Sequence, residues 1–517
     1  MCMVKTKYGQ IRGLDRDSMR LFCGVPYAQP PVGELRFRAP REPLPWKGVL
    51  DCTKHKPAAM QHVCPEDISG LSEPYITDFF FDGVPECSED SLYLTIAAPK
   101  DDGPHPVYIW HHGGGLNAGF AYEHEFNPRA FVENGVVVVS VTQRLNVFGF
   151  LALPQLAEEG ESGNWGLMDE LLALKWVKEN IAFFGGDPER ITVGGQSGGT
   201  TKAICLAIAA REKPQRLILE SGVKWRTRFP SQEEAWARGK AYLRDLGLPE
   251  DITAQELRAL PAARLMDPSS PHYSGAMVRS SLLPFDGVQE AFDAGELDGI
   301  SVLAGLNLGE ASAPDGMDET ALLTFWSECI GAENAADVRR RLSHLDPGDA
   351  ARYMAVMGLC RDSGVNQSRN LALVRLFAME AHRRSAAPVY VYLFSRTPPG
   401  IDADKGTERD PDVLWAWHAG ELWYAFASLD DGMPPCRPWQ PEDFALAQAM
   451  NGYFSNFITT GDPNSGPYAP DIAWPCGAGG AYLRLDASIA AFAAGEYADA
   501  ALLDYTRREF RIGIHKE

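Results

Sequence analysis

The sequence contains no run of basic residues. Lys and Arg together number 48 against 69 Asp and Glu, which gives a formal net charge of −21. Because nucleic acid is held by clustered Lys and Arg that neutralise phosphates, we expect no nucleic-acid partner. The acidic balance favours neutral or cationic small molecules over anionic ones.

Long apolar stretches are also absent. Residues 1–9 have no apolar core of the kind that a signal peptide carries, and no uninterrupted apolar run of about 18 residues follows. We therefore expect no secretion and no membrane span, and we expect the protein in the cytoplasm. The glycosylation pattern at Asn366 is then accidental, because glycosylation requires the secretory route.

The ten cysteines form no CxxC pair and no cluster with histidine at metal-site spacing. We therefore expect no metal site, and no pattern in the sequence points to a cofactor. Free and buried thiols are typical of a reducing compartment. Cys64 and Cys87 flank a loop and would pair only in an oxidising location.

No internal repeat, low-complexity tract or long Gly/Ser linker divides the chain, so we expect a single domain over residues 1–517. β-Branched apolar runs typical of buried strands alternate with segments of helical spacing. Strands are expected at 107–110, 136–141, 191–193, 300–304 and 389–394, and helices at 165–184, 203–210 and 444–458. This order predicts an α/β fold with a large, mostly parallel sheet covered by helices on both faces. A helical insertion around 231–280 and a helical segment around 311–387 are expected to form a lid or gorge.

One short motif points to a nucleophile. The run Gly195-Gln196-Ser197-Gly198-Gly199 matches G-x-S-x-G and lies directly between a predicted strand and a predicted helix. A nucleophile in this place needs a tight, strained turn, and glycine at 195 and 199 removes the Cβ atoms that would clash there. The alternative is a glycine-rich turn that contains serine by chance, and the flanking elements argue against it.

A second glycine motif follows the strand expected at 107–110. The run His112-Gly113-Gly114-Gly115 has the placement of an oxyanion loop, because backbone N–H groups can converge only where side chains are absent. Gly114, Gly115 and Gly198 are the expected donors. A plain glycine-rich hairpin is the alternative.

With these two motifs, several longer blocks make the chain resemble the type-B carboxylesterase and cholinesterase family, which includes bacterial para-nitrobenzyl-type esterases. The blocks are residues 22–33, 36–37, 88–90, 163–169, 180–188 and 461–464. They span nearly the whole chain except the regions around 231–280 and 311–387. The resemblance implies the α/β-hydrolase fold and hydrolysis of carboxylic esters by a Ser-His-Glu triad through an acyl-enzyme.

The acid and base of such a triad must follow Ser197 in the chain. The histidines that qualify are His272, His344, His382, His418 and His515. His418 lies in a segment similar to the family's catalytic loop, so we expect it to be the base, with a surface or capping role as the alternative. Glu310 follows a strand in a segment similar to the one that carries the family's acid. Asp315 and Glu319 remain alternatives, because Gly309 and Ala311 depart from the family pattern.

Other departures concern the surroundings of Ser197. The family commonly has Glu before the nucleophile and Ala after it, whereas this chain has Gln196 and Gly198. The backbone N–H at 198 is kept, but a negative charge beside the reaction centre is lost. Lys202 occupies a position that is usually apolar, and we expect it to reach solvent along its apolar stem or to pair with a carboxylate.

The substrate pocket is expected to involve Gln196, Trp417 and Leu116. Several further aromatic residues are expected to rim the gorge, with simple core packing as the alternative: Phe79, Phe80, Phe81, Trp415, Trp423 and Tyr424. The predicted substrates are small to medium, neutral carboxylic esters. The rival interpretation is a non-catalytic recognition protein, since this family also contains adhesion molecules that have lost triad members.

Overall fold

The computed structural model describes residues 1–62, 73–83, 85–158, 160–311, 317–359, 370–492 and 499–512. Cys64, Asp315, Asn366 and His515 therefore lie outside the described residues. The chain divides into two compact units. Unit 1 comprises Met1–Gln215 and Thr227–Leu297, and unit 2 comprises Arg216–Arg226 and Asp298–Glu517. The single domain over 1–517 stays a prediction.

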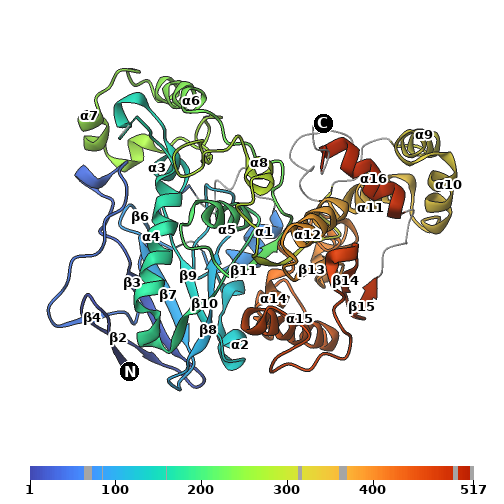
Figure 1. Cartoon of the computed structure of the whole chain (residues 1–517), viewed down its shortest axis with the longest axis horizontal. Coiled ribbons are helices and arrows are strands. Elements are labelled where there is room, and N and C mark those ends of the chain that lie inside the picture. Colours follow the sequence, from blue (N-terminus) through green and yellow to red (C-terminus); the bar gives the residue numbers. More distant parts are fainter. Residues whose placement is uncertain are drawn as a thin grey trace. The chain divides into compact units, whose positions relative to one another are not determined.

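The strands of unit 1 form a mixed sheet in the order β1-β2-β3-β7-β9-β8-β10 (Figure 1). Pairing is antiparallel from β1 to β9 and parallel between β9, β8 and β10. A short strand β4 pairs with β2, and β5 pairs with β6. The bounds are β1 Cys2–Lys5, β2 Gln10–Asp15, β3 Arg20–Pro26, β4 Val49–Asp51, β5 Ala58–Ala59, β6 Cys87–Ser88, β7 Tyr93–Ala98, β8 His105–His111, β9 Val137–Val141 and β10 Gly186–Gln196.

Helices cover the strands of unit 1, and α4 and α5 lie side by side against β10 (Figure 1). The predicted helix at 165–184 is confirmed as α4 followed by a 3-10 turn, and the helix ends where Gly185 takes a left-handed φ of +87°. The helices are α1 Glu73–Phe79, α2 Arg129–Glu133, α3 Asn146–Phe150, α4 Trp165–Asn180, α5 Gly198–Ala209, α6 Gln232–Asp245, α7 Ala254–Ala259 and α8 Val288–Asp293.

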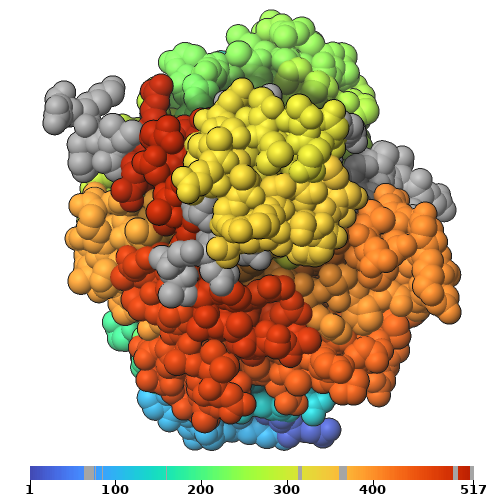
Figure 2. Space-filling model, turned by 90° about the vertical axis from the view of Figure 1, so that its right-hand side faces the viewer, coloured from blue at the N-terminus to red at the C-terminus, as the bar shows by residue number. Residues whose placement is uncertain are grey.

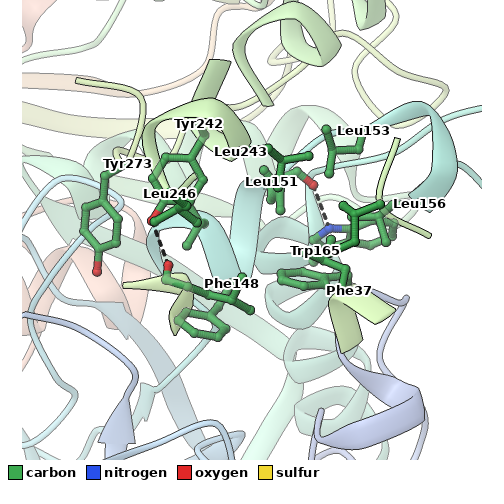
Figure 3. Packing of buried hydrophobic residues seen from close by; sticks show 14 residues of the cluster. Phe37, Phe148, Leu151, Leu153, Leu156, Trp165, Tyr242, Leu243, Leu246 and Tyr273 are labelled. Carbon is green, nitrogen blue, oxygen red and sulfur yellow. Dashed lines mark hydrogen bonds between the residues drawn. The ribbon is translucent and has the colours of Figure 1, made fainter. Parts of the chain in front are cut away.

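The helical region around 231–280 is anchored in the interior of unit 1. Helix α6 starts with a capping box between Ser231 and Glu234. Its buried Tyr242 and Leu243 pack in a cluster with Phe148 and Trp165 (Figure 3). Burial of each such side chain stabilises the fold by about 1.5–3 kcal/mol. The role of this region as a lid stays a prediction.

Unit 2 carries a sheet in the order β11-β12-β13-β14-β15, parallel except for the last pair. The strands are β11 Arg216–Glu220, β12 Ser301–Asn307, β13 Val389–Phe394, β14 Tyr482–Leu485 and β15 Ala490–Phe492. The helices are α9 Glu319–Ile330, α10 Ala332–Arg341, α11 Pro347–Met357, α12 Leu371–Ser385, α13 Pro411–Leu414, α14 Leu422–Ala425, α15 Pro441–Thr460 and α16 Asp499–Phe510. Helix α12 packs on β12 and β13, and Figure 2 shows α9 and α10 in yellow on the surface of this unit. Within the described ranges, no helix is long and apolar enough to span a membrane.

Candidate active site

Ser197 lies at the junction of β10 and α5, in a strained turn. Its φ of 54° and ψ of −112° are rare for a residue with a side chain, and such strain costs on the order of 1–3 kcal/mol. A Cβ atom added at Gly195 would clash with the backbone of Gly199, and one added at Gly199 would clash with the carbonyl of His111. The glycines predicted to permit this turn are therefore sterically required.

The glycine loop, residues 113–115, packs against the Ser197 turn. Gly114 and Gly115 have φ of +76° and +66°, a left-handed conformation that favours glycine, and both residues are exposed. A Cβ atom added at Gly113 would lie 3.8 Å from the Cβ of Ser197. At Gly198 an added Cβ would clash with the carbonyl oxygen of Gly115. The three expected oxyanion donors are thus held close to the expected nucleophile within unit 1.

Gly198→Ala is expected to impair the site, although alanine is the residue that the family commonly has here. The new methyl group would push the backbone of Gly115 away, because a backbone atom yields less easily than a side-chain end. Since loss of one oxyanion donor costs about 10²–10³ in rate, we expect kcat to fall by about 10-fold or more. Steady-state kinetics with a neutral ester measures the effect. Gly479→Ala is the matched control, because nothing lies within 4 Å of the added atom at that position, and wild-type kcat in Gly198→Ala would contradict the prediction.

In unit 2, Glu310 contacts His418. Glu310 Oε2 lies 3.2 Å from His418 Nδ1, and its carboxylate is buried. The other oxygen, Oε1, accepts the N–H of Asn307 at 3.1 Å. Of the alternative acids, Glu319 lies in the first turn of α9 and pairs with Arg339 at 2.9 Å, whereas Asp315 is outside the described residues.

The segments that carry Glu310 and His418 are tied together by backbone contacts. The N–H of Gly309 donates to the carbonyl of Ala416 at 2.8 Å. A Cβ atom at 309 would lie only 2.6 Å from the same carbonyl oxygen, which explains why glycine replaces the usual residue before Glu310. The guanidinium of Arg352 donates to carbonyls of both segments, at Gly309 (3.1 Å), Ala311 (2.7 Å), Val413 (2.6 Å) and Leu414 (3.1 Å).

A second carboxyl group lies behind this pair. The side-chain amide of Asn307 donates to the Trp417 carbonyl at 2.7 Å and to Glu421, and Ser221 Oγ donates to Glu421 at 3.1 Å. Burial, together with the charge of Glu310, raises the pKa of Glu421 to about 8. Burial therefore favours the neutral form of Glu421, whereas the carboxylate that contacts His418 Nδ1 is that of Glu310.

The expected pocket residues divide between the two units. Gln196 is buried, 2% exposed, and Leu116 is buried directly after the glycine loop. Trp417 is buried in unit 2 beside His418. Trp423 and Tyr424 lie in α14 with no exposed surface and pack on Trp439, so for these two the core-packing alternative holds.

Several residues of the site could not be recognised in the sequence. Arg352 belongs to no motif, and Asn307 and Glu421 lie in the Glu310 and His418 segments without an assigned role. Of the two expectations for Lys202, the one that it reaches solvent is wrong, because its side chain is fully buried in unit 1; the alternative, a carboxylate partner, is favoured by the charges of Glu170 and Glu123 that act on it. In the part of the chain that is described, no group of three or more His, Cys, Asp or Glu is placed to hold a metal ion.

Comparison with known proteins identifies a family and several relatives. A profile of the Carboxylesterase family matches residues 2–291 and 353–490. The para-nitrobenzyl esterase of Bacillus subtilis (strain 168) is 30% identical over 491 residues, 92% of this chain and 92% of the relative. Neuroligin-2 of Homo sapiens is 28% identical over 536 residues, 89% of this chain but 61% of the relative.

Solved structures of esterases share the fold. A PNB esterase structure aligns with a TM-score of 0.75 at 27% identity, over 97% of this chain and 99% of the other. Carboxylesterase EST55 of Geobacillus stearothermophilus aligns with a TM-score of 0.73 at 28% identity, with the same coverage of both chains. The predicted α/β-hydrolase fold is confirmed, and the chain belongs to the carboxylesterase family.

Proposed function

We propose that the protein is a serine carboxylic-ester hydrolase, with Ser197 as nucleophile, His418 as general base and Glu310 as the acid that orients the base. The observation that carries the proposal is the strained Ser197 turn with the glycine loop packed against it. The 3.2 Å contact between Glu310 and His418 supports the other two roles.

The roles of the three residues follow from the proton transfers that ester hydrolysis requires. His418 accepts the Ser197 proton as Oγ attacks the ester carbonyl, and it then donates that proton to the leaving alcohol. The backbone N–H groups of Gly114, Gly115 and Gly198 stabilise the oxyanion of each tetrahedral intermediate. Glu310 holds the imidazole tautomer and stabilises the imidazolium. Water then attacks the acyl-enzyme with His418 as its base and releases the carboxylic acid.

The second candidate is a non-catalytic recognition protein, favoured by the similarity to neuroligin-2. Reaction with a fluorophosphonate probe separates the two. We expect stoichiometric labelling of Ser197, identified by peptide mass spectrometry, and no labelling of folded Ser197→Ala. Folded wild-type protein that remains unlabelled would overturn the enzyme proposal.

We further propose that the substrates are small to medium, neutral esters, because Gln196 places an uncharged amide where cholinesterase-like relatives have a carboxylate. Two charges about 4 Å apart are worth roughly 4 kcal/mol at an effective dielectric near 20, so the missing carboxylate removes a large preference for cations. The net charge of −21 steers cations only at long range, and that steering is screened at about 0.15 M ionic strength.

At physiological salt, kcat/KM for a neutral ester is therefore expected to equal or exceed that for its isosteric choline ester. Gln196→Glu should shift the ratio toward the choline ester, which parallel steady-state assays of both substrates would show. A preference of wild type for the choline ester of about tenfold or more, unchanged by salt, would contradict the prediction and indicate another anionic or aromatic subsite.

A further inference from the structure

Lys202 lies in α5 with none of its surface exposed. Removing an ammonium from water costs several kcal/mol unless it is paired and hydrogen-bonded, so lysine is almost never found in this state without a partner. The ammonium has such a partner in the backbone, since Nζ donates to the carbonyl of His112 at 3.1 Å.

A second partner is the buried amide of Gln143. Because an ammonium has only donors, the amide must turn its oxygen toward it, and the oxygen then lies 2.7 Å from Nζ. The third neighbour is the ring nitrogen Nε2 of His112, at 3.5 Å. In that orientation the Gln143 oxygen also accepts from His112 Nε2 at 3.2 Å, so the donors of Lys202 are directed at the His112 carbonyl and at Gln143.

Two buried carboxyl groups, Glu170 and Glu123, act electrostatically on Lys202. Burial lowers the pKa of Lys202 to about 8, and the charges of Glu170 and Glu123 act against this shift and favour the ammonium. Glu170 is itself buried, with Oε1 3.9 Å from His111 Nδ1. Burial also raises the pKa of Glu170 to about 8 and raises that of Glu123.

The carbonyl of His112 stands where the sheet ends and the glycine loop begins. The parallel ladder between β8 and β10 stops at the pair His111 and Gly195, so the next carbonyl needs a partner outside the ladder. An added Cβ at Gly199 would lie 2.9 Å from that oxygen, which places the carbonyl between the first turn of α5 and the ammonium. The orientation of the His112 carbonyl determines the direction in which the backbone enters residues 113–115.

We propose that Lys202 is a positioning residue for the oxyanion donors: its buried ammonium holds the His112 carbonyl and thereby keeps the N–H groups of Gly114 and Gly115 aimed at the reaction centre of Ser197. This inference rests on the proposed function. It assigns to Lys202 the role of supporting the glycine loop, whose N–H groups stabilise the negative charge of the oxyanion.

Lys202→Met keeps the length and apolar stem of the side chain but removes its donors and its charge. Since loss of a whole oxyanion donor costs about 10²–10³, misaligned donors should lower kcat by about 10- to 100-fold. KM should change little, because the interaction matters mainly in the transition state. An alkyl trifluoromethyl ketone, to which Ser197 Oγ adds to form a tetrahedral oxyanion, should lose affinity by the same factor as kcat/KM.

Leu206→Met is the control for repacking, because Leu206 is buried in the same helix and contributes no polar group; it should keep wild-type kcat. If Lys202→Met lowers melting temperature and leaves kcat and the ketone affinity unchanged, Lys202 is only structural and the proposal is wrong. Should Lys202→Met not fold, Lys202→Leu replaces it, because leucine also lacks a donor, and a folded Lys202→Leu with wild-type kcat overturns the proposal equally. A different result would show that the proposed function itself is wrong. In that case, wild-type protein would neither hydrolyse esters nor react with the fluorophosphonate.

Discussion

Ser197→Ala is expected to lower kcat for ester hydrolysis by about five to six orders of magnitude, since members of a catalytic triad act as a unit. The fold should persist, because alanine keeps the Cβ that already tolerates the strained turn. Any remaining rate would come from the glycine loop and from substrate binding. The measurement is kcat for a neutral ester, with circular dichroism and melting temperature to verify folding.

His418→Ala should lose a similar factor, and the double variant should be little worse than either single variant. This non-additivity distinguishes a nucleophile and its base from two residues that support the fold independently. A folded single variant that keeps more than about 1% of wild-type kcat, free of contaminating esterase, would show that the triad assignment is wrong. His382→Ala is the control, because His382 lies in the last turn of α12 and bonds the Ala387 carbonyl at 2.9 Å.

The elements that frame the site could be predicted because each has a strong local signal. The strand at 389–394 coincides with β13, and the apolar run at 136–141 differs from β9 by one residue. The start of α15 was predicted too late in the chain. The helix begins at Pro441, whereas the apolar spacing that indicated it begins only at residue 444. The Ser197 turn was predictable for the same reason, because sterically required glycines are visible in the sequence.

The supports of the site were not predictable, because they join positions that are far apart in the chain. Arg352 lies in α11 and bonds segments on both sides of it in sequence. Lys202 illustrates the opposite difficulty: lysine normally reaches water, and only the fold brings the His112 carbonyl and the Gln143 amide to its ammonium. Such polar contacts leave no periodicity or motif in the sequence.

Glu310→Gln should keep the fold and lower kcat by about 10²–10⁴, and the contacts of Glu310 indicate why. The N–H of Asn307 donates to Oε1, so the amide oxygen of the variant should occupy that position. The amide nitrogen would then face His418 Nδ1, where Oε2 now lies at 3.2 Å. An N–H donor at this point forces Nδ1 to accept, so the ring proton moves to Nε2 and the base can no longer take the Ser197 proton. A neutral amide also fails to stabilise the imidazolium.

Steady-state kcat, compared among folded variants, tests this assignment, with Glu319→Gln as the matched control. Glu319 pairs with Arg339 at 2.9 Å and lies in the first turn of α9, so its variant should retain wild-type kcat. A near-wild-type rate in Glu310→Gln together with a large loss in Glu319→Gln or Asp315→Asn would move the acid to one of those residues. If only Glu310→Gln loses activity, the buried carboxylate of Glu310 is the group that holds His418 in its working tautomer.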